Sequence, residues 1–373
     1  MEQIADICSA QRKIINNCKD IIAMRRLFPL FLMLFVVSIV ATAQQRKFNV
    51  YAVGFYNLEN LFDTCHDTGK NDYEFLANGS YKWNGIKYSN KLANMSRVLA
   101  EMGTDVLPSS VGCALIGVSE VENARALSDL IAQPALAARG YQFCHIEGLD
   151  RRGVDCALLY QPKLFEVKSV HLHPYVQALE KDSAYKTRGF LTVNGILAGE
   201  SVTVIVNHLP SRFNGSFYRE QGAKQITVIK DSILRESPAT KIIVMGDMND
   251  DPMDKSMAVE LRGKRYIKDV EPMDMYNPWW NVLVKDGKGT LMYDGRWNLF
   301  DQILLSSNLL CKAGVKDYST LKYLKHQIFT RDYMLQTEGK YKGSPKRTHA
   351  GGVWLNGFSD HFPTVVYLVK ELK

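Results

Sequence analysis

Short runs of β-forming residues, each adjoining a polar residue at one end, constrain the fold of this chain more than any other feature. The runs are apolar, rich in Val, Ile and Tyr, and only a few residues long, which favours strands over helices. They lie at residues 50–56, 115–118, 154–160, 202–206, 242–245, 303–305 and 364–369. Since strands of this kind must bury an apolar face, the sequence predicts packed β-sheets.

Helices are predicted between some of these runs. Residues 89–102, 124–136 and about 218–235 carry apolar residues at helical spacing, and Asn123 can cap the second of these helices. Residues 319–348 are polar and weakly periodic, which predicts a long loop. Because no break in composition divides the chain after residue 43, we expect one α+β domain made of two packed sheets with outer helices.

The N-terminal segment differs from the rest of the chain. Arg25 and Arg26 precede an apolar run at 27–40, which Ala41-Thr42-Ala43 follow. This order is typical of a secretory signal peptide, and the run is shorter than the roughly 20 residues that usually span a bilayer. We predict a leader at 1–43, a catalytic domain at 44–373, and export to the periplasm or the exterior. An uncleaved N-terminal membrane anchor is the alternative.

Composition adds weaker constraints. With 46% hydrophobic and 23% charged residues, the chain is globular in type and not disordered. Its net charge of +7 is mildly favourable for a polyanionic substrate but occurs in many soluble proteins. Cys144 and Cys156 lie in neighbouring β-runs, so a disulfide and two buried thiols are both open. No cysteine or histidine pair has zinc spacing.

The polar residues at the ends of the runs carry the functional signal. Four runs lead into polar residues, and two runs follow them: Asn57 and Glu59, Glu120, Asn207 and His208, Asp247 and Asn249, then Asp301, and Asp360 with His361. If the last two strands run antiparallel to the other four, all six groups meet at one edge of the sheets. Such a rim suits Mg²⁺, which prefers oxygen ligands, and phosphate chemistry, which needs charge stabilisation.

These residues match the motifs of a known family. In order they are Asn57-Leu58-Glu59, Glu120 in Ser-Glu-Val-Glu-Asn, Asn207-His208-Leu209, Gly246-Asp247-Met248-Asn249, Asp301 in Phe-Asp-Gln-Ile-Leu, and Ser359-Asp360-His361. Each motif is weak alone, but their order over residues 48–370 is specific. The chain resembles the endonuclease/exonuclease/phosphatase superfamily, and residues 57–63 resemble its bacterial subgroup of predicted extracellular nucleases. The resemblance implies a deoxyribonuclease-like four-layer α/β/β/α sandwich with two mainly antiparallel sheets.

The resemblance also implies the ligands of a divalent metal ion, Mg²⁺ with Mn²⁺ as a substitute. Glu120 would be the principal ligand, with Glu122 as a competitor for that role, while Glu59 and Asp360 would assist directly or through water. Asn57 would orient the phosphate or a metal-bound water. Taken singly, each of these residues is as well explained as a surface acid or a turn former.

Acid–base roles follow from the same resemblance. Asp301 would fix the tautomer of His361 and raise its basicity. Asp247, steadied by Asn249, would position or deprotonate the attacking water, and the choice of base between Asp247 and the His361–Asp301 pair stays open. His208 would contact the scissile phosphate or protonate the leaving oxygen.

Two arginines and an aromatic group are secondary candidates. Arg188 and Arg212 adjoin the motif strands and can bind phosphate, although a solvated surface charge explains each equally well. Trp279, Trp280, Tyr293 and Trp297 precede Asp301, and we expect them to cover the edge of a core more than to stack on a base.

Three functions are weighed. A secreted nuclease that cleaves phosphodiester bonds of nucleic acid is the first, and the same chemistry on a lipid headgroup or another small phosphoester is the second. A binding protein without catalysis is the third, and the intact acids and histidines argue against it because clustered acids without a cation repel one another. No protein partner can be inferred, and we expect a monomer.

Overall fold

The structure is a computed structural model that describes residues 46–176, 185–311 and 314–372. The chain divides into a short N-terminal unit and a compact unit from Phe48 to Lys373, which is the subject here. The predicted leader and its apolar run at 27–40 lie outside the described residues. Within the described part of the chain, no helix is both long and apolar enough to span a membrane.

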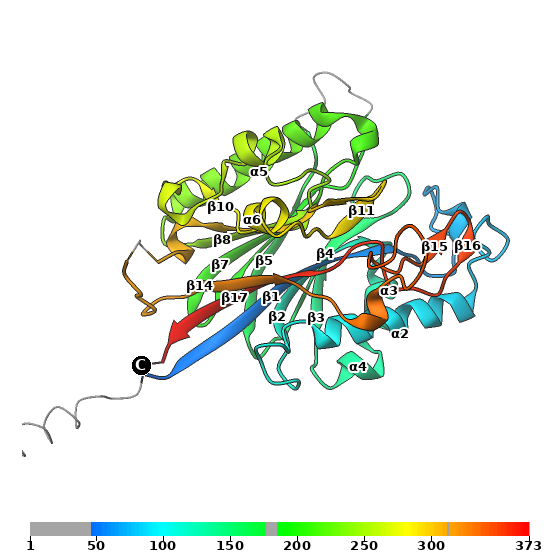
Figure 1. Cartoon of the computed structure of the whole chain (residues 1–373), viewed down its shortest axis with the longest axis horizontal. Coiled ribbons are helices and arrows are strands. Elements are labelled where there is room, and N and C mark those ends of the chain that lie inside the picture. Colours follow the sequence, from blue (N-terminus) through cyan, green and yellow to red (C-terminus); the bar gives the residue numbers. More distant parts are fainter. Residues whose placement is uncertain (1–45, 177–184, 312–313, 373) are drawn as a thin grey trace, which may run out of the picture. The chain divides into compact units, whose positions relative to one another are not determined.

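Two large sheets form the body of this unit (Figure 1). The six-stranded sheet has the order β14-β17-β1-β2-β4-β3, made of Lys322–Ile328, Thr364–Glu371, Phe48–Leu61, Cys113–Val121, Asp155–Tyr160 and Gln142–His145. The seven-stranded sheet has the order β5-β6-β7-β8-β13-β10-β9, made of Phe165–His173, Phe190–Leu197, Glu200–His208, Lys241–Asp247, Asp301–Ser306, Met275–Tyr276 and Gly263–Lys264. Every β-run predicted from the sequence is a strand of one of these sheets.

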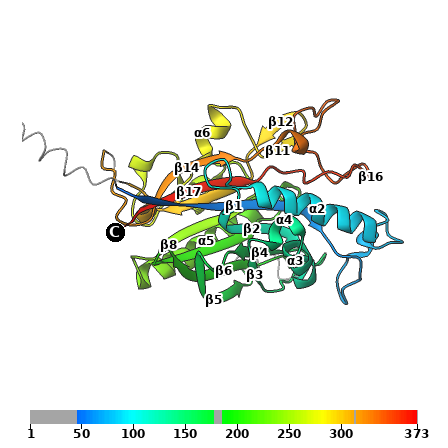
Figure 2. The same ribbon diagram turned by 90° about the horizontal axis from the view of Figure 1, so that it is seen from below.

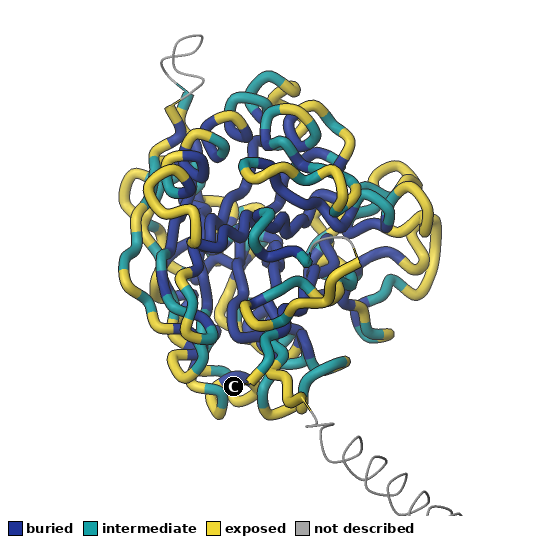
Figure 3. The backbone as a smooth tube through the Cα atoms, turned by 90° about the vertical axis from the view of Figure 1, so that its left-hand side faces the viewer, coloured by how far each residue is buried: buried dark blue, intermediate teal, exposed yellow. Residues whose placement is uncertain are grey.

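Helices cover the outer faces of both sheets (Figure 1), and Figure 2 shows β14 and β17 of one sheet above β6 and β8 of the other. The helices α2 (Gly85–Glu101), α3 (Ala124–Ile131) and α4 (Pro134–Ala137) pack against the six-stranded sheet, while α5 (Ser216–Glu236) packs against the seven-stranded sheet. A third apolar core fills the space between the sheets, and the buried backbone runs through the centre of Figure 3. The predicted α/β/β/α sandwich is therefore confirmed.

The remaining elements are short. They comprise the helix α6 (Trp279–Val284), the hairpin of β11 (Leu291–Tyr293) and β12 (Arg296–Asn298), and the hairpin of β15 (His349–Ala350) and β16 (Val353–Trp354). Both hairpins follow long excursions from the large sheets, and both lie near the ends of strands that carry the predicted site residues.

Two local predictions were wrong. The segment 319–348 is not all loop, because β14 pairs antiparallel with β17 at the edge of its sheet. An edge strand is only half buried, so it can be polar and lacks a clear apolar signal. The helix predicted at 124–136 ends at Ile131, and Pro134 begins the separate turn α4 because proline cannot donate a helical hydrogen bond.

Strand directions bring the motif residues together. Most strand pairs are antiparallel, whereas β1 with β2, β7 with β8 and β9 with β10 are parallel. The carboxyl ends of β1 and β2 therefore lie at one edge, as do those of β7 and β8. β17 runs antiparallel to β1, and β13 runs antiparallel to β8, with Asp301 directly opposite Asp247. The condition that we set for a common rim is met.

Candidate active site

Asn57 lies at the centre of the rim and contacts acids from two other strands. Its buried side-chain amide donates to Asp247 Oδ2 at 3.0 Å and to Glu120 Oε1 at 3.3 Å. Its own oxygen accepts the Glu59 backbone N–H at 2.8 Å. Residues 63 and 190 positions from Asn57 therefore meet on a single amide, which orients two carboxylates without adding charge.

Glu120 and Glu122 have different surroundings, which separates the two competitors. Glu120 keeps 16% of its side chain exposed, and its Oε2 accepts the Asn60 N–H at 2.9 Å. Glu122 is buried, its Oε2 accepts the Asp63 N–H at 2.7 Å, and burial raises its pKa to about 8. Of the two, Glu120 is the one with a partly exposed carboxylate at the rim, which can bind a cation.

His361 and Asp301 form the expected pair. His361 Nδ1 lies 2.7 Å from Asp301 Oδ2, and the backbone N–H of His361 is held by Ser359 Oγ at 3.1 Å. The other ring nitrogen, Nε2, lies 3.8 Å from Asp247 and 3.8 Å from Asp360. Burial lowers the pKa of His361, but Asp301 and Asp247 outweigh it and hold that pKa well above the usual value. The ring is therefore a cation at neutral pH, with Nε2–H available to an anion.

Asp247 and His208 face each other across the rim. His208 Nε2 lies 3.5 Å from Asp247 Oδ2, and the other oxygen of Asp247 accepts the Asn249 N–H at 2.9 Å. Burial and the carboxylates of Asp301 and Glu120 raise the pKa of Asp247 to about 7, although His361 acts in the opposite direction. Burial, with the nearby charge of Arg188, lowers the pKa of His208 well below its usual value. His208 is thus a neutral donor, which argues against the leaving-group acid that we considered.

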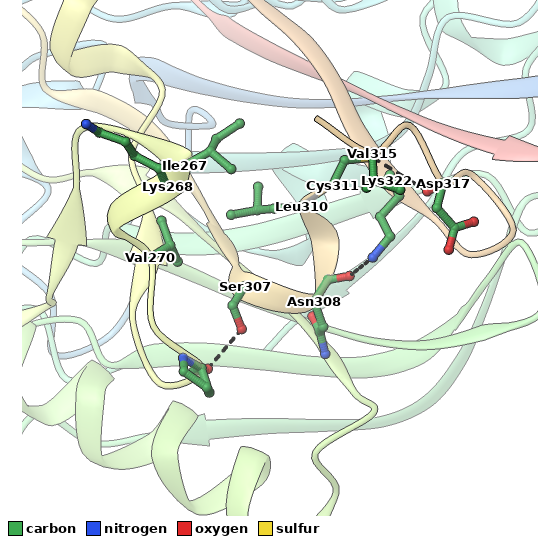
Figure 4. A pocket seen from close by; sticks show the side chains of 11 residues that line it. Ile267, Lys268, Val270, Ser307, Asn308, Leu310, Cys311, Val315, Asp317 and Lys322 are labelled. Atoms are coloured by element: carbon green, nitrogen blue, oxygen red, sulfur yellow. Dashed lines mark hydrogen bonds between the residues drawn. The ribbon is translucent and has the colours of Figure 1, made fainter. Parts of the chain in front are cut away.

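These groups open into one hollow of about 510 Å³. Its walls include seven of the predicted residues and several further cations; the main lining residues are Glu120, His208, Asp247, Asn249, Asp360, His361, Arg188, Arg151, Arg152 and Lys186. A second hollow of about 630 Å³ has a mainly aliphatic wall around Ile267, Leu310 and Val315 (Figure 4). None of the predicted site residues lines that second hollow.

Glu59 and Asp360 are joined by Arg347, which the sequence did not suggest. Arg347 Nη2 donates to Asp360 Oδ2 at 2.8 Å, and its Nε lies 3.4 Å from Glu59 Oε1. Glu59 is buried and its Oε2 accepts the Thr348 N–H at 2.6 Å. Burial and the charge of Asp360 raise the pKa of Glu59 to about 7. The oxygens of Glu59 are thus committed to protein donors, whereas Asp360 lines the hollow.

The donors at the rim fit a hard cation that keeps much of its water. No group of three or more His, Cys, Asp or Glu side chains in the described ranges is arranged as a metal-binding cluster. Glu120 and Asp360 are partly exposed at the rim, and Mg²⁺ is usually held by one or two carboxylates plus water and substrate oxygens. Burial, together with the charges of Asp301 and Glu120, raises the pKa of Asp247, and a cation nearby would act in the opposite direction.

The two predicted arginines differ in their availability. Arg188 lines the hollow, but it donates to Asp150 Oδ2 at 2.9 Å and to the His208 carbonyl at 3.1 Å, so it mainly fixes the chain beneath His208. Arg212 is held by Asp251 and Asp254, at 3.0 and 2.8 Å, and does not line the hollow. Neither has a free guanidinium edge for phosphate in this arrangement.

The aromatic candidates are mainly structural, as expected. Trp279 is fully buried and donates to the Ile303 carbonyl, and Trp297 packs on Phe362. Tyr293, on β11, is 75% exposed and is the exception. Of the alternatives for Cys144 and Cys156, the structure has free buried thiols.

Sequence reasoning missed several residues of the site. Arg152 and Lys186 line the hollow from loops, and Lys91 is a buried lysine whose neighbours include the Glu59 carboxylate. The stretch Arg151-Arg152-Gly153 before a strand was a visible signal for the first of these. Lys91 offered none, because a lysine in an amphipathic helix is normally solvated.

Comparisons with known proteins identify the family and agree with the fold. The sequence profile of the Endonuclease/Exonuclease/phosphatase family matches residues 52–370. A protein of that family from Bacteroides thetaiotaomicron has 17% identity and a TM-score of 0.55, covering 88% of this chain and 100% of that chain. A mannosyl-6-phosphatase from the same organism has 16% identity and a TM-score of 0.52, covering 85% and 99%. At such identities the likeness concerns the fold. No protein of curated function matched the chain in sequence.

Proposed function

Because the chain belongs to the endonuclease/exonuclease/phosphatase family, we propose that it is a Mg²⁺-dependent phosphoesterase that hydrolyses phosphodiester bonds of nucleic acid. Members of this family hydrolyse phosphate esters. One observation carries the proposal: Asn57 bridges Glu120 and Asp247, and these two acids line one hollow together with His208 and with His361, which Asp301 holds. This set supplies a metal ligand, a base and two donors for a phosphate, which phosphoester hydrolysis requires.

Glu120 and Asp360 would hold the cation, Mg²⁺ or Mn²⁺ in its place. The cation would polarise the phosphoryl oxygen and neutralise the charge that develops on it. Asn57 fixes the orientation of the Glu120 carboxylate through its amide and also contacts Asp247, so the two acids lie side by side at the rim.

Asp247 is the better candidate for the base. Asn57 and Asn249 hold its two oxygens in place, and a carboxylate fixed in this way beside the hollow can take a proton from a bound water. His361 is held as a cation by Asp301, so its Nε2–H serves as a donor to the phosphate rather than as a base. His208, which is neutral, donates a second hydrogen bond.

The preference for nucleic acid rests on what surrounds the hollow. Arg151 and Lys186 are exposed beside it, and the Arg152 side chain has long contacts to Asn60 at 3.4 Å and to Asp150 at 3.8 Å. Such cations can neutralise phosphates that flank the scissile bond. Phe213, between two residues that line the hollow, is 98% exposed and offers a ring for stacking on a base.

A small phosphoester is the second candidate. The hollow of about 510 Å³ is large enough for a sugar phosphate or a lipid headgroup, and the similar Bacteroides thetaiotaomicron protein described above is a mannosyl-6-phosphatase. A pure binding protein is the weakest reading, because the site retains both a base and a metal ligand.

A substrate panel tests the proposal. The chain from Gln44 onward is assayed with plasmid DNA, RNA, a phospholipid and a phosphomonoester, each with Mg²⁺, Mn²⁺ or Ca²⁺ and with a chelator. We expect nucleic acid to be cleaved, with loss on chelation and recovery with Mg²⁺ or Mn²⁺. Turnover of the phosphomonoester or phospholipid alone would transfer the function to the second candidate, and no turnover at all would favour a binder.

Export and assembly are separate proposals. We propose that the protein is secreted after cleavage near Gln44, on the strength of the pattern in residues 25–43. N-terminal sequencing of the exported form tests this, since an intact N-terminus in the membrane fraction would indicate an anchor. We also propose a monomer, which light scattering can check.

A further inference from the structure

Lys91 is a fully buried lysine that the proposed chemistry does not use. It lies in α2, and its ammonium group donates to Thr348 Oγ1 at 2.5 Å and to the Phe358 carbonyl at 2.6 Å. Both partners belong to the segment 346–361, which contains the β15–β16 hairpin and leads into β17. The carboxylates of Glu59, Asp360 and Glu120 act on this ammonium group electrostatically.

A second side chain of α2 holds the same segment. Asn94, three residues after Lys91 and so on the same helix face, donates to the Gly357 carbonyl at 2.8 Å. The two legs of the segment are residues 346–348 before the hairpin and 355–361 after it. They touch at Gly357, since a Cβ there would lie 2.1 Å from the Arg347 carbonyl oxygen. The Phe358 N–H also donates to the Lys346 carbonyl at 2.7 Å. Helix α2 therefore bonds to the segment at the point where its two legs contact each other.

These contacts lie directly before two predicted site residues, Asp360 and His361. Phe358, whose carbonyl Lys91 holds, precedes Ser359, whose hydroxyl donates to the Asn57 carbonyl at 2.7 Å and accepts the His361 N–H. On the other leg, Thr348 donates its N–H to Glu59. Lys91 thus acts at both legs of the segment that presents Asp360 and His361 to the hollow.

Stability alone does not require a charged side chain at this buried position. Burying an ammonium group is costly, and replacing a buried charge by a well-packed apolar residue is often neutral or stabilising. What an apolar residue cannot supply is a pair of directed hydrogen bonds between α2 and the two legs. We propose that Lys91 is a positioning residue, which fixes the segment 346–361 so that Asp360 and His361 keep their places beside Asp247.

The inference rests on the proposed function for its kinetic readout, so the experiment pairs kinetics with hydrogen exchange. The variants are Lys91→Met, which keeps the length and removes the donor, and Lys91→Arg, which keeps a donor and the charge. The matched control is Lys230→Met: Lys230 is also fully buried, in α5, and donates to Asp231 and to the Met273 carbonyl, outside the hollow. Metal-dependent turnover and backbone exchange are measured on the chain from Gln44 onward.

We expect Lys91→Met to lower kcat by roughly 10- to 100-fold, with KM changed by less than about threefold. Losses of this size are usual when a residue that orients a site residue is removed. Exchange should accelerate within 346–361, Lys91→Arg should recover part of the kcat, and Lys230→Met should change neither quantity. Asn94→Ala should give a smaller loss in the same direction, which keeps the test open if Lys91→Met does not fold.

Other outcomes would overturn the inference. Near-native kcat in Lys91→Met would do so, as would unchanged exchange in 346–361. An equal fall in kcat for Lys230→Met would reduce the effect to general destabilisation. If the wild-type chain had no hydrolytic activity, the proposed function would fail, while the exchange data on 346–361 would still decide the positioning role.

Discussion

The two ends of the same central strands have opposite electrostatic character. β7 runs from Glu200 to His208, β8 runs from Lys241 to Asp247, and β17 begins just after His361 and contains Lys370 near its other end. Each of the three strands therefore contributes one charged group to the end remote from the hollow and leads to or from a site residue at the other.

At the remote end, the charges compensate one another. Glu200 accepts from Lys241 at 2.5 Å, from Lys370 at 2.8 Å and from the Leu321 N–H at 2.8 Å. Burial opposes these contacts, but the two lysines prevail and lower the pKa of Glu200 below its usual value. This is an arrangement that favours the folded state.

At the hollow, the same fold keeps groups uncompensated. Among the residues that the structure describes, His208 Nδ1 and Asp301 Oδ1 are buried and find no hydrogen-bond partner. Glu59, Glu120 and Asn249 adopt positive φ angles of 46°, 60° and 50°, a strained conformation for such residues. The contrast indicates that the fold accepts unpaired and strained groups at the strand ends that carry the predicted site residues. At the opposite ends of the same strands, the charged groups are paired.

The largest effect should come from removing the cationic donor at the hollow. His361→Ala is expected to lower kcat by roughly 10²- to 10⁴-fold, because both the phosphate donor and the partner of Asp301 disappear. Steady-state kinetics at saturating Mg²⁺ and thermal unfolding measure the two consequences. Near-native turnover in a folded variant would remove His361 from the chemistry.

The next effect concerns the metal ion. Glu120→Gln should raise the Mg²⁺ concentration needed for half-maximal activity by roughly 10- to 100-fold, since a neutral amide replaces the exposed carboxylate. Calorimetric titration with Mg²⁺ checks this without substrate. Glu122→Gln is the matched control, because Glu122 is buried against the Asp63 N–H and should leave the Mg²⁺ requirement unchanged.

Stability at the two ends should respond to pH with opposite sign. The pKa of Asp247 is raised from 3.8 to about 7, so its ionisation destabilises the fold increasingly between these values and fully above the higher one. Without a divalent cation, Asp247→Asn should therefore gain on the order of 1–2 kcal/mol at pH 8, and little at pH 4.

Glu200→Gln tests the remote end, where we expect the opposite dependence of stability on pH. The pKa of Glu200 lies below 4.5, so its contribution is present above that pH and is lost as pH falls through the folded value. The variant should lose about 1 kcal/mol at pH 8, a modest value because the cluster is partly exposed, and less at acid pH. Urea unfolding with a chelator measures both variants, and parallel pH profiles would contradict the contrast.

The smallest effect should come from the exposed ring beside the hollow. Phe213→Ala is expected to raise KM for an oligonucleotide by about fivefold through lost stacking, with kcat nearly unchanged. Phe213→Trp should restore the affinity, and a glycerol phosphodiester, which has no ring, should not distinguish the three proteins. An equal rise for that substrate would assign Phe213 a structural role.

The sequence by itself determined the strands and the chemistry at their ends. Apolar runs report burial locally, so residues 50–56 and 242–245 could be recognised as strands without their partners. Asn57, Glu120, Asp247, Asp301 and His361 could be selected because each adjoins such a run and together they follow the order of a family. Their meeting at one rim followed once the strand directions were correct.

Only the tertiary structure decided which charged side chains are available to a ligand and which are paired within the protein. Arg212 was a candidate for phosphate until the fold surrounded it with acids, and Lys91 gave no signal until it met Thr348, 257 positions away. The polar strand β14 was hidden for the same reason, since its pairing with β17 is its main support. Hydrophobic periodicity is a local property of a sequence, whereas the neutralisation of a charge depends on partners that folding alone brings near.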